Sequence, residues 1–185
     1  IRVQAIKLAA ILEHEAEATA SEDEMLSEFG DAIFDDGWSW VGGNPDGDVT
    51  IVEFLDYRCG FCKRAFPAVE ELVESDGNIR IIVKEFPILG PALELGARYA
   101  IATKRVVGDD AYKAVHDTMM TMRGNLSEAA LAGISSNLSL DHGAIEAEMQ
   151  SETVSRVIAS HRELAGRLDI QGTPSLIMSE TIVRG

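Results

Sequence analysis

The amino-acid sequence predicts an α/β fold. Segments 49–57 and 79–86 are rich in β-branched and aromatic residues, which indicates buried strands, and segment 62–75 between them carries apolar residues at helical spacing. Residues 91–168 hold helical patterns and no convincing strand, and two short apolar segments follow them. The expected order is therefore a strand–helix–strand unit, a long helical block and a closing pair of strands.

Residues 1–37 are expected to form an N-terminal helical arm. Ile1, Ala5, Leu8 and Leu12 recur at helical spacing, and the run "EHEAEATASEDE" that follows is strongly acidic. Such a segment can pack on its own domain, serve as a self-association arm or remain a partly disordered leader, and the sequence leaves these alternatives open.

The turn-forming cluster "GGNPDGD" at 42–48 marks the entry to the strand–helix–strand unit. In the helical block, Ser127 and Asp141 are plausible N-caps. Helical patterns occupy residues 91–106, 109–122, 127–136, 141–149 and 151–168. The segments "QGTPSLIM" and "TIVRG" then predict two strands around a turn at 179–180. The strand–helix–strand unit therefore lies within residues 38–90, the helical block at 91–168 and the two closing strands within 169–185.

The overall charge limits the partners of this protein. The 185 residues carry a net charge of −15, and such a surface repels phosphate backbones, so a nucleic-acid partner is not expected. No uninterrupted apolar run approaches the roughly 20 residues needed to span a bilayer. The chain begins with Ile1 rather than Met, which fits a processed or trimmed form such as one without its secretory signal.

The two cysteines of the chain, Cys59 and Cys62, lie two residues apart where a predicted strand meets a predicted helix. Free backbone N–H groups and the helix dipole at a helix start favour a thiolate over a thiol, which lowers the pKa and creates a nucleophile. Cys62, about one turn further on, can attack a mixed disulfide formed at Cys59 and release the partner. The arrangement therefore suits dithiol–disulfide exchange.

Other uses of the cysteine pair are less well supported. A structural zinc site needs four ligands, and no two of His14, His116, His142 and His161 lie at ligand spacing. A stapling disulfide is not needed for a core of this size. Cu(I) needs fewer ligands and prefers thiolates, so Cu(I) binding by the same two thiols stays open as an alternative. We expect no resident metal or other cofactor.

A second signal comes from Thr173-Pro174, directly before an apolar strand. Proline cannot donate a hydrogen bond to a sheet ladder. A cis Thr173-Pro174 bond would turn the chain and leave backbone groups open beside the cysteines, where a bound peptide could pair with them. The alternative is a trans proline at the start of a strand.

Three segments, "FLDYRCGFCK", "KEFPILGP" and "QGTPSLI", together resemble the DsbA-like branch of the thioredoxin superfamily. Within this branch, residues 38–185 look closest to ScsC-type (suppressor of copper sensitivity C) envelope disulfide proteins. The resemblance implies a thioredoxin fold with an inserted helical domain and an N-terminal helical extension, and a cis Pro174. It also implies a final helix after the strand pair, whereas this chain stops at Gly185.

The same resemblance implies a protein thiol–disulfide oxidoreductase or isomerase that is periplasmic or secreted. Its partners would be cysteine-containing protein substrates and a membrane or soluble redox partner, and the N-terminal helices could form a homo-oligomer. One departure bears on the chemistry. The dipeptide between the cysteines is Gly60-Phe61 instead of the Pro-His of the DsbA oxidase, so we expect a less depressed thiol pKa and a weaker oxidant.

Glu53 is the third candidate catalytic residue. Two-residue alternation places it on one strand face with Leu55 and Tyr57, so its carboxyl group is expected to be buried, where it could accept the proton of Cys62. The alternative is a solvent-facing Glu at a strand start. Lys84 is expected either to pair with Glu53 or to lie at the surface.

The remaining expected site residues bind substrate. They are Thr173, Pro174, Phe61 and Gly60, with Phe61 exposed to contact unfolded polypeptide. Phe66 is expected in the core, Pro67 is expected to kink its helix, and His116 and His161 are expected to be ordinary helix residues.

Overall fold

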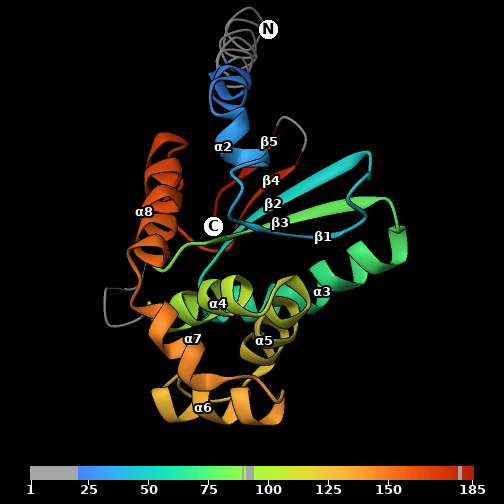
Figure 1. The fold of residues 1–185 in the computed structure, drawn as a ribbon. Helices are drawn as coiled ribbons and strands as arrows, with labels where there is room; N and C mark the ends of the chain where they lie inside the picture. Colours follow the sequence, from blue (N-terminus) through green and yellow to red (C-terminus); the bar gives the residue numbers. More distant parts are fainter. Residues whose placement is uncertain (1–20, 89, 91–93, 179–180) are drawn as a thin grey trace, which may run out of the picture.

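A five-stranded mixed sheet forms the centre of the computed structural model, which describes residues 21–88, 90, 94–178 and 181–185 (Figure 1). The strands are β1 (Trp40–Gly43), β2 (Val49–Leu55), β3 (Ile79–Glu85), β4 (Ser175–Met178) and β5 (Thr181–Val183). Their order is β1-β3-β2-β4-β5, with β2 and β3 parallel and the other pairs antiparallel. The predicted α/β class and the two strand pairs are confirmed.

Strand β1 was not predicted. Its residues Gly42 and Gly43 resemble the start of a turn, but Gly42 has a packing reason. A Cβ atom at Gly42 would lie 1.9 Å from the ring of Trp40, so only glycine leaves room for this buried indole. Gly43 adopts a positive φ of 68°, which glycine allows without strain.

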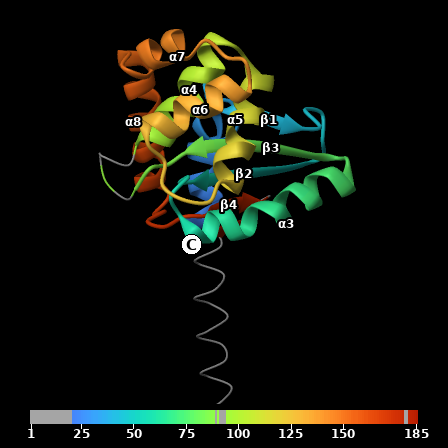
Figure 2. The same cartoon turned by 90° about the horizontal axis from the view of Figure 1, so that it is seen from below.

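Helix α3 (Gly60–Asp76) connects the parallel strands β2 and β3 and runs alongside them (Figure 2). It ends at Gly77, which has a left-handed φ of 71°, and Pro67 lies inside it. The helices between β3 and β4 are α4 (Leu95–Val106), α5 (Asp109–Thr121), α6 (Glu128–Asn137), α7 (His142–Met149) and α8 (Glu152–Arg167). The predicted N-caps are confirmed, because the side chains of Ser127 and Asp141 accept hydrogen bonds from the backbone N–H groups of Ala130 and Ala144, the third residues of the helices that they precede.

The sheet separates two apolar clusters. Alternation along β2 places Leu55 with Cys62 and Phe66 in the cluster that contacts α3 to α7, whereas Val52 and Phe54 face the opposite cluster with Ile33. Figure 1 shows the corresponding arrangement, with α2 (Gly30–Phe34) on one side of the sheet and α4 to α7 gathered on the other. Cys62 therefore belongs to the buried layer between the sheet and the helical block.

Residues 21–28 are helical and are followed by α2, while residues 1–20 of the expected arm lie outside the described residues. A buried polar cluster joins this region to the sheet. Lys84 of β3, fully buried, donates to the Ala32 carbonyl at 2.8 Å and pairs with Asp36 at 2.5 Å. His161 of α8 also reaches Asp36, at 3.2 Å.

These contacts correct two expectations. Lys84 neither pairs with Glu53 nor lies at the surface. Its buried ammonium group forms an ion pair with the carboxylate of Asp36 instead. His161 is not an ordinary helix residue, because its ring is buried and hydrogen-bonded at both nitrogens. Among the described residues, no helix is long and apolar enough to cross a membrane.

Candidate active site

The cysteine pair lies where β2 passes into α3. The turn is fixed by Asp56, whose backbone carbonyl accepts from the Cys59 N–H at 2.9 Å and whose carboxylate accepts from the Arg58 N–H at 2.8 Å. Cys59 is the N-cap of α3, and its Sγ accepts a hydrogen bond from the Cys62 N–H at 3.4 Å. Both cysteines are free, so the pair is in its dithiol state.

The Thr173–Pro174 bond is cis, as the resemblance implied. Strand β4 follows directly and pairs antiparallel with β2, with Ser175 opposite Phe54, and this pairing brings the turn to the end of β2. The Cys59 thiol donates a hydrogen bond to the Thr173 carbonyl oxygen at 3.1 Å. Two motifs far apart in the sequence are therefore in direct contact.

The environment separates the acidities of the two thiols. Partial burial opposes ionisation of Cys59, but hydrogen bonding by the Thr173 side chain and by the backbone of Cys62 and Phe61 holds the pKa of the Cys59 thiol below its ordinary value. Cys62 is fully buried, and burial together with the neighbouring Cys59 raises the pKa of its thiol to about 12. Cys59 is therefore the accessible and more acidic thiol.

Glu53 is buried, as the strand pattern predicts, with 2% of its surface exposed. It lies on the same face of β2 as Leu55 and Tyr57, which is the face that contacts α3. Its Oε1 atom has no hydrogen-bond partner within the part of the chain that the structure describes. Burial, with a smaller contribution from the charge of Glu70, raises the pKa of its carboxyl group to about 7.

A second buried carboxyl group, Glu85, was missed in the sequence. Tyr57 and Tyr112 both donate to its Oε1 atom, at 2.8 and 2.6 Å, and His116 Nδ1 lies 2.9 Å from the Tyr57 hydroxyl oxygen. Burial raises the pKa of Glu85 to about 8, although the two tyrosine hydroxyls act in the opposite direction. Glu85 lies two residues after Val83 on β3, so the two side chains share one face of the sheet, and Val83 pairs with Glu53. This two-residue spacing was the sequence signal that Glu85 lies on the same face as Glu53.

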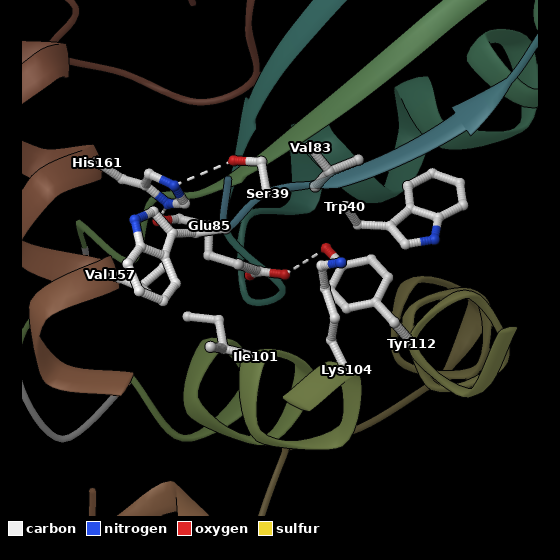
Figure 3. A pocket seen from close by; sticks show the side chains of 10 residues that line it. Ser39, Trp40, Val83, Glu85, Ile101, Lys104, Tyr112, Val157 and His161 are labelled. Atoms are coloured by element: carbon white, nitrogen blue, oxygen red, sulfur yellow. Dashed lines mark hydrogen bonds between the residues drawn. The ribbon is translucent and has the colours of Figure 1, made fainter. Parts of the chain in front are cut away.

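His116 is likewise not an ordinary helix residue. Its ring stacks on Tyr112 at 5.8 Å and meets Phe66 edge-on at 5.5 Å, and burial lowers the pKa of its imidazole to about 3. Figure 3 shows the carboxyl group of Glu85 directed toward Tyr112, beside His161 and Trp40. Glu85 lines a small cavity of about 10 Å³ there, which has room for about one water molecule.

Two surface hollows are lined by residues that neighbour the two cysteines in the chain or contact Cys59. The larger, about 490 Å³, is lined by Phe61, Arg64, Ala65, Thr173, Pro174 and Gly185. The smaller, about 200 Å³, is lined by Tyr57, Arg58, Lys63, Met122, Gly124, Asn125 and Leu126. Phe61 is 68% exposed as expected, and the guanidinium of Arg64 lies 4.1 Å from the centre of its ring.

Two further residues lie where the sequence predicts them. Gly60 is the first residue of α3, and Phe66 is buried in the core, as predicted. Within the part of the chain that the structure describes, no three His, Cys, Asp or Glu side chains gather as a metal site.

Residues 36–185 match the family described as thioredoxin. A solved thioredoxin-like oxidoreductase from Silicibacter pomeroyi DSS-3 is 37% identical, with a TM-score of 0.78, and the match covers 84% of this chain and 88% of that one. The thiol-disulfide exchange protein alpha-DsbA2 from Wolbachia pipientis is 27% identical, with a TM-score of 0.83 and coverage of 91% and 90%. The catalytic domain of Proteus mirabilis ScsC shares the fold, with 24% identity, a TM-score of 0.78 and coverage of 88% and 89%.

These matches confirm the thioredoxin fold and the resemblance to DsbA-like proteins that the three sequence segments indicated. The first curated relatives are longer. The chain is 30% identical over 142 residues to the Na(+)/H(+) antiporter NhaA 1 of Salinispora arenicola and covers 75% of its own length. It spans only 21% of the length of that relative.

Proposed function

Since this chain belongs to the thioredoxin family, we propose that it is a thiol–disulfide oxidoreductase acting on cysteines of other proteins through Cys59 and Cys62. The observation that carries this proposal is the contact of the partly exposed Cys59 thiol with the cis Thr173–Pro174 turn, 3.1 Å from sulfur to carbonyl oxygen. The unequal acidity of the two thiols supports the same reading, because it provides one nucleophile and one protected thiol.

The exchange proceeds in two steps. The Cys59 thiolate attacks one sulfur of a substrate disulfide, the substrate S–S bond breaks, and the second substrate sulfur leaves as a thiolate. Cys62 then loses its proton and attacks the Cys59 sulfur, which releases the first substrate sulfur and leaves a Cys59–Cys62 disulfide. The substrate gains two electrons and the pair loses two. The reverse sequence oxidises a substrate dithiol, and isomerisation results when another substrate thiol resolves the mixed disulfide.

Glu53 is proposed as the proton acceptor for Cys62. A carboxyl group with a pKa of about 7 can exchange protons at neutral pH, and Glu53 lies on the sheet face that contacts the helix bearing Cys62. The Cys62 thiol, with a pKa of about 12, is almost entirely protonated at neutral pH. Loss of this proton therefore limits the rate at which Cys62 attacks the mixed disulfide, unless a base accepts the proton. Glu53 acts in either direction, since it can return the proton.

Thr173 and Pro174 are proposed to hold the substrate backbone beside Cys59. An extended peptide can add to a sheet edge through its backbone groups, and the larger hollow between Phe61 and Pro174 offers apolar surface for its side chains. Gly60 is the first residue of α3, directly after Cys59, and we propose that the lack of a side chain there lets the substrate backbone approach.

The resemblance to DsbA-like proteins supports a periplasmic or secreted location and a membrane or soluble redox partner. We also propose the division into an N-terminal helical arm (1–37), a thioredoxin-like domain (38–90 and 169–185) and an inserted helical domain (91–168), with the arm as a route to a homo-oligomer. Cu(I) binding by the same thiols stays an alternative prediction.

The proposal is tested by equilibrating the reduced protein with glutathione buffers and measuring its activity on a scrambled disulfide substrate. We expect a defined redox potential for one pair, activity in the wild type and none in the Cys59→Ser variant. A wild type without exchange activity, whose Cu(I) binding in competition with a chelator is far tighter than that of Cys59→Ser, would favour copper handling instead. Retained activity in Cys59→Ser would point to a peptide-holding role that needs no thiols.

A further inference from the structure

The basic side chains of this acidic protein differ in whether they form ion pairs. Of the 14 Lys and Arg residues that the structure describes, eight form ion pairs with carboxylates. Among the six without such a partner in the described residues, four lie around the cysteine pair, namely Arg58, Lys63, Arg64 and Arg123. We call these four residues the basic rim. The other two, Arg80 and Arg156, lie elsewhere, on β3 and α8.

The basic rim follows the two hollows beside the cysteines. Arg58 and Lys63 line the smaller hollow, Arg64 lines the larger one, and Arg123 lies in the chain between two residues that line the smaller one. Arg58, Arg64 and Arg123 are exposed, whereas the Lys63 ammonium donates to two backbone carbonyls at the end of α5. Three exposed guanidinium groups therefore lie on, or adjacent in the chain to, the residues that line the two hollows.

Among the residues that the structure describes, no Asp or Glu lines either hollow. Asp56, the acidic residue nearest to Cys59 in the chain, is buried and accepts hydrogen bonds from the N–H groups of Arg58 and Ile88. From Tyr57 to Ala68 the chain contains three basic residues and no acidic one, although the protein as a whole carries 31 acidic residues against 16 basic ones. The surface around the pair is thus opposite in charge to the rest of the molecule.

The range of electrostatic forces makes this local reversal effective. At physiological ionic strength, exposed charges are screened over about 8 Å, so a segment seated in the hollows responds to the basic rim more than to acidic side chains on remote faces. The Arg64 guanidinium lies over the Phe61 ring, and among the described residues its N–H groups have no hydrogen-bond partner, beside an apolar wall of Ala65 and Pro174. Such a surface is complementary to a polypeptide with both apolar and acidic side chains near its cysteine.

We propose that the basic rim selects substrate segments whose cysteine is flanked by acidic residues. This inference rests on the proposed function and names the substrate class of the same site. Carboxylates of the bound segment pair with Arg58, Arg64 and Arg123, and these pairs position the substrate sulfur at Cys59. Basic flanks are disfavoured, because they place like charges together beside the hollows.

The test uses three peptides of equal length, each joined through its single cysteine to a fluorophore by a mixed disulfide. The residues flanking the cysteine are Glu in one peptide, Gln in the second and Lys in the third. The second-order rate constant with reduced protein is divided by that with dithiothreitol, which removes the effect of the flanks on intrinsic disulfide reactivity. We expect the Glu peptide to exceed the Gln peptide about threefold to tenfold at low salt, and the ratio to approach one near 1 M salt.

Two double variants decide the origin of the preference. Arg58→Gln/Arg64→Gln is expected to bring the Glu-to-Gln ratio close to one. Arg156→Gln/Arg167→Gln removes the same charge from the exposed surface of α8 and is expected to keep the wild-type ratio. A wild-type ratio of one or less, or an equal loss of the preference in both variants, would overturn the inference.

If the proposed function is wrong, the same experiment gives a different set of rates. If reduced wild type exchanges with none of the peptides, the oxidoreductase proposal fails, and the basic rim is then tested by binding alone. Peptides with Ser in place of Cys are titrated with the Cys59→Ser protein, and fluorescence anisotropy reports their affinities. Tighter binding of the Glu peptide than of the Lys peptide supports the inference, and equal affinities refute it.

Discussion

Replacing Glu53 with Gln is expected to raise the free energy of unfolding by about 3 kcal/mol at pH 8 and to leave it nearly unchanged at pH 4. The carboxyl group has a pKa of about 7 in the folded protein against an ordinary value of 4.5. Each tenfold difference in proton affinity corresponds to about 1.4 kcal/mol, which gives the figure of about 3 kcal/mol. Glutamine has the shape of the protonated acid and carries no charge, so the variant avoids burying a carboxylate.

The sign follows from proton binding. Below about pH 4.5, Glu53 is protonated in both the folded and the unfolded protein, so it does not lower the free energy of unfolding. As the pH rises toward 7, the unfolded chain releases the proton while the folded protein retains it, so wild-type stability falls, and above pH 7 the loss is complete. Glu85 titrates in both proteins, so its contribution largely cancels in the comparison.

Urea denaturation of both reduced proteins, followed by circular dichroism at pH 4, 6 and 8, measures the difference. Glu71→Gln, on the exposed surface of α3, is the matched control and is expected to change stability little at each pH. If the gap between Glu53→Gln and wild type is the same at pH 4 and pH 8, the reasoning from burial of Glu53 is wrong.

Three further predictions concern the thiols and the buried lysine. Iodoacetamide should modify Cys59 alone in the folded protein, with a rate midpoint below pH 9.0, and mass spectrometry that finds Cys62 equally modified would contradict the assigned acidities. Thr173→Val removes the side-chain hydroxyl that lowers the pKa of Cys59 and keeps the backbone carbonyl that accepts from the thiol. The variant should raise the pKa of Cys59, measured by thiolate absorbance near 240 nm, and an unchanged or lower value would exclude this contribution. Lys84→Met leaves the carboxylate of Asp36 without its buried partner and should lower the free energy of unfolding by about 3–5 kcal/mol in urea, with partial recovery when Asp36→Asn is added. A loss below about 1 kcal/mol would show that the pair is not needed in the interior.

Much of the candidate site could be predicted because its signals are local. Cys59 and Cys62 sit at a strand–helix boundary, which short apolar and β-branched patterns locate well. The cis Thr173–Pro174 turn was inferred from a distinctive segment before an apolar strand. The burial of Glu53 followed from alternation along one strand, which requires no knowledge of tertiary contacts.

What could not be predicted depends on contacts between distant segments. Lys84 meets Asp36 across 48 positions, and Asp36 falls in a stretch whose pattern predicts only a helical arm. The helical pattern at 109–122 indicates a buried face, but not that Tyr112 and His116 on that face reach Glu85 and Tyr57. Strand β1 was not predicted, because glycine is typical of turns and the sequence does not show that Gly42 makes room for the Trp40 ring.

The contact between Cys59 and Thr173 has a consequence for biosynthesis, because 114 positions separate the two residues. A ribosome adds about 5–20 residues per second, so Thr173 is made roughly 6–23 s after Cys59. Once both sulfurs have left the ribosome, the nascent chain still lacks the turn that later borders them, and a thiol or an oxidant can reach either one. Trapping the nascent thiols with a maleimide at successive chain lengths would reveal the length at which this exposure ends.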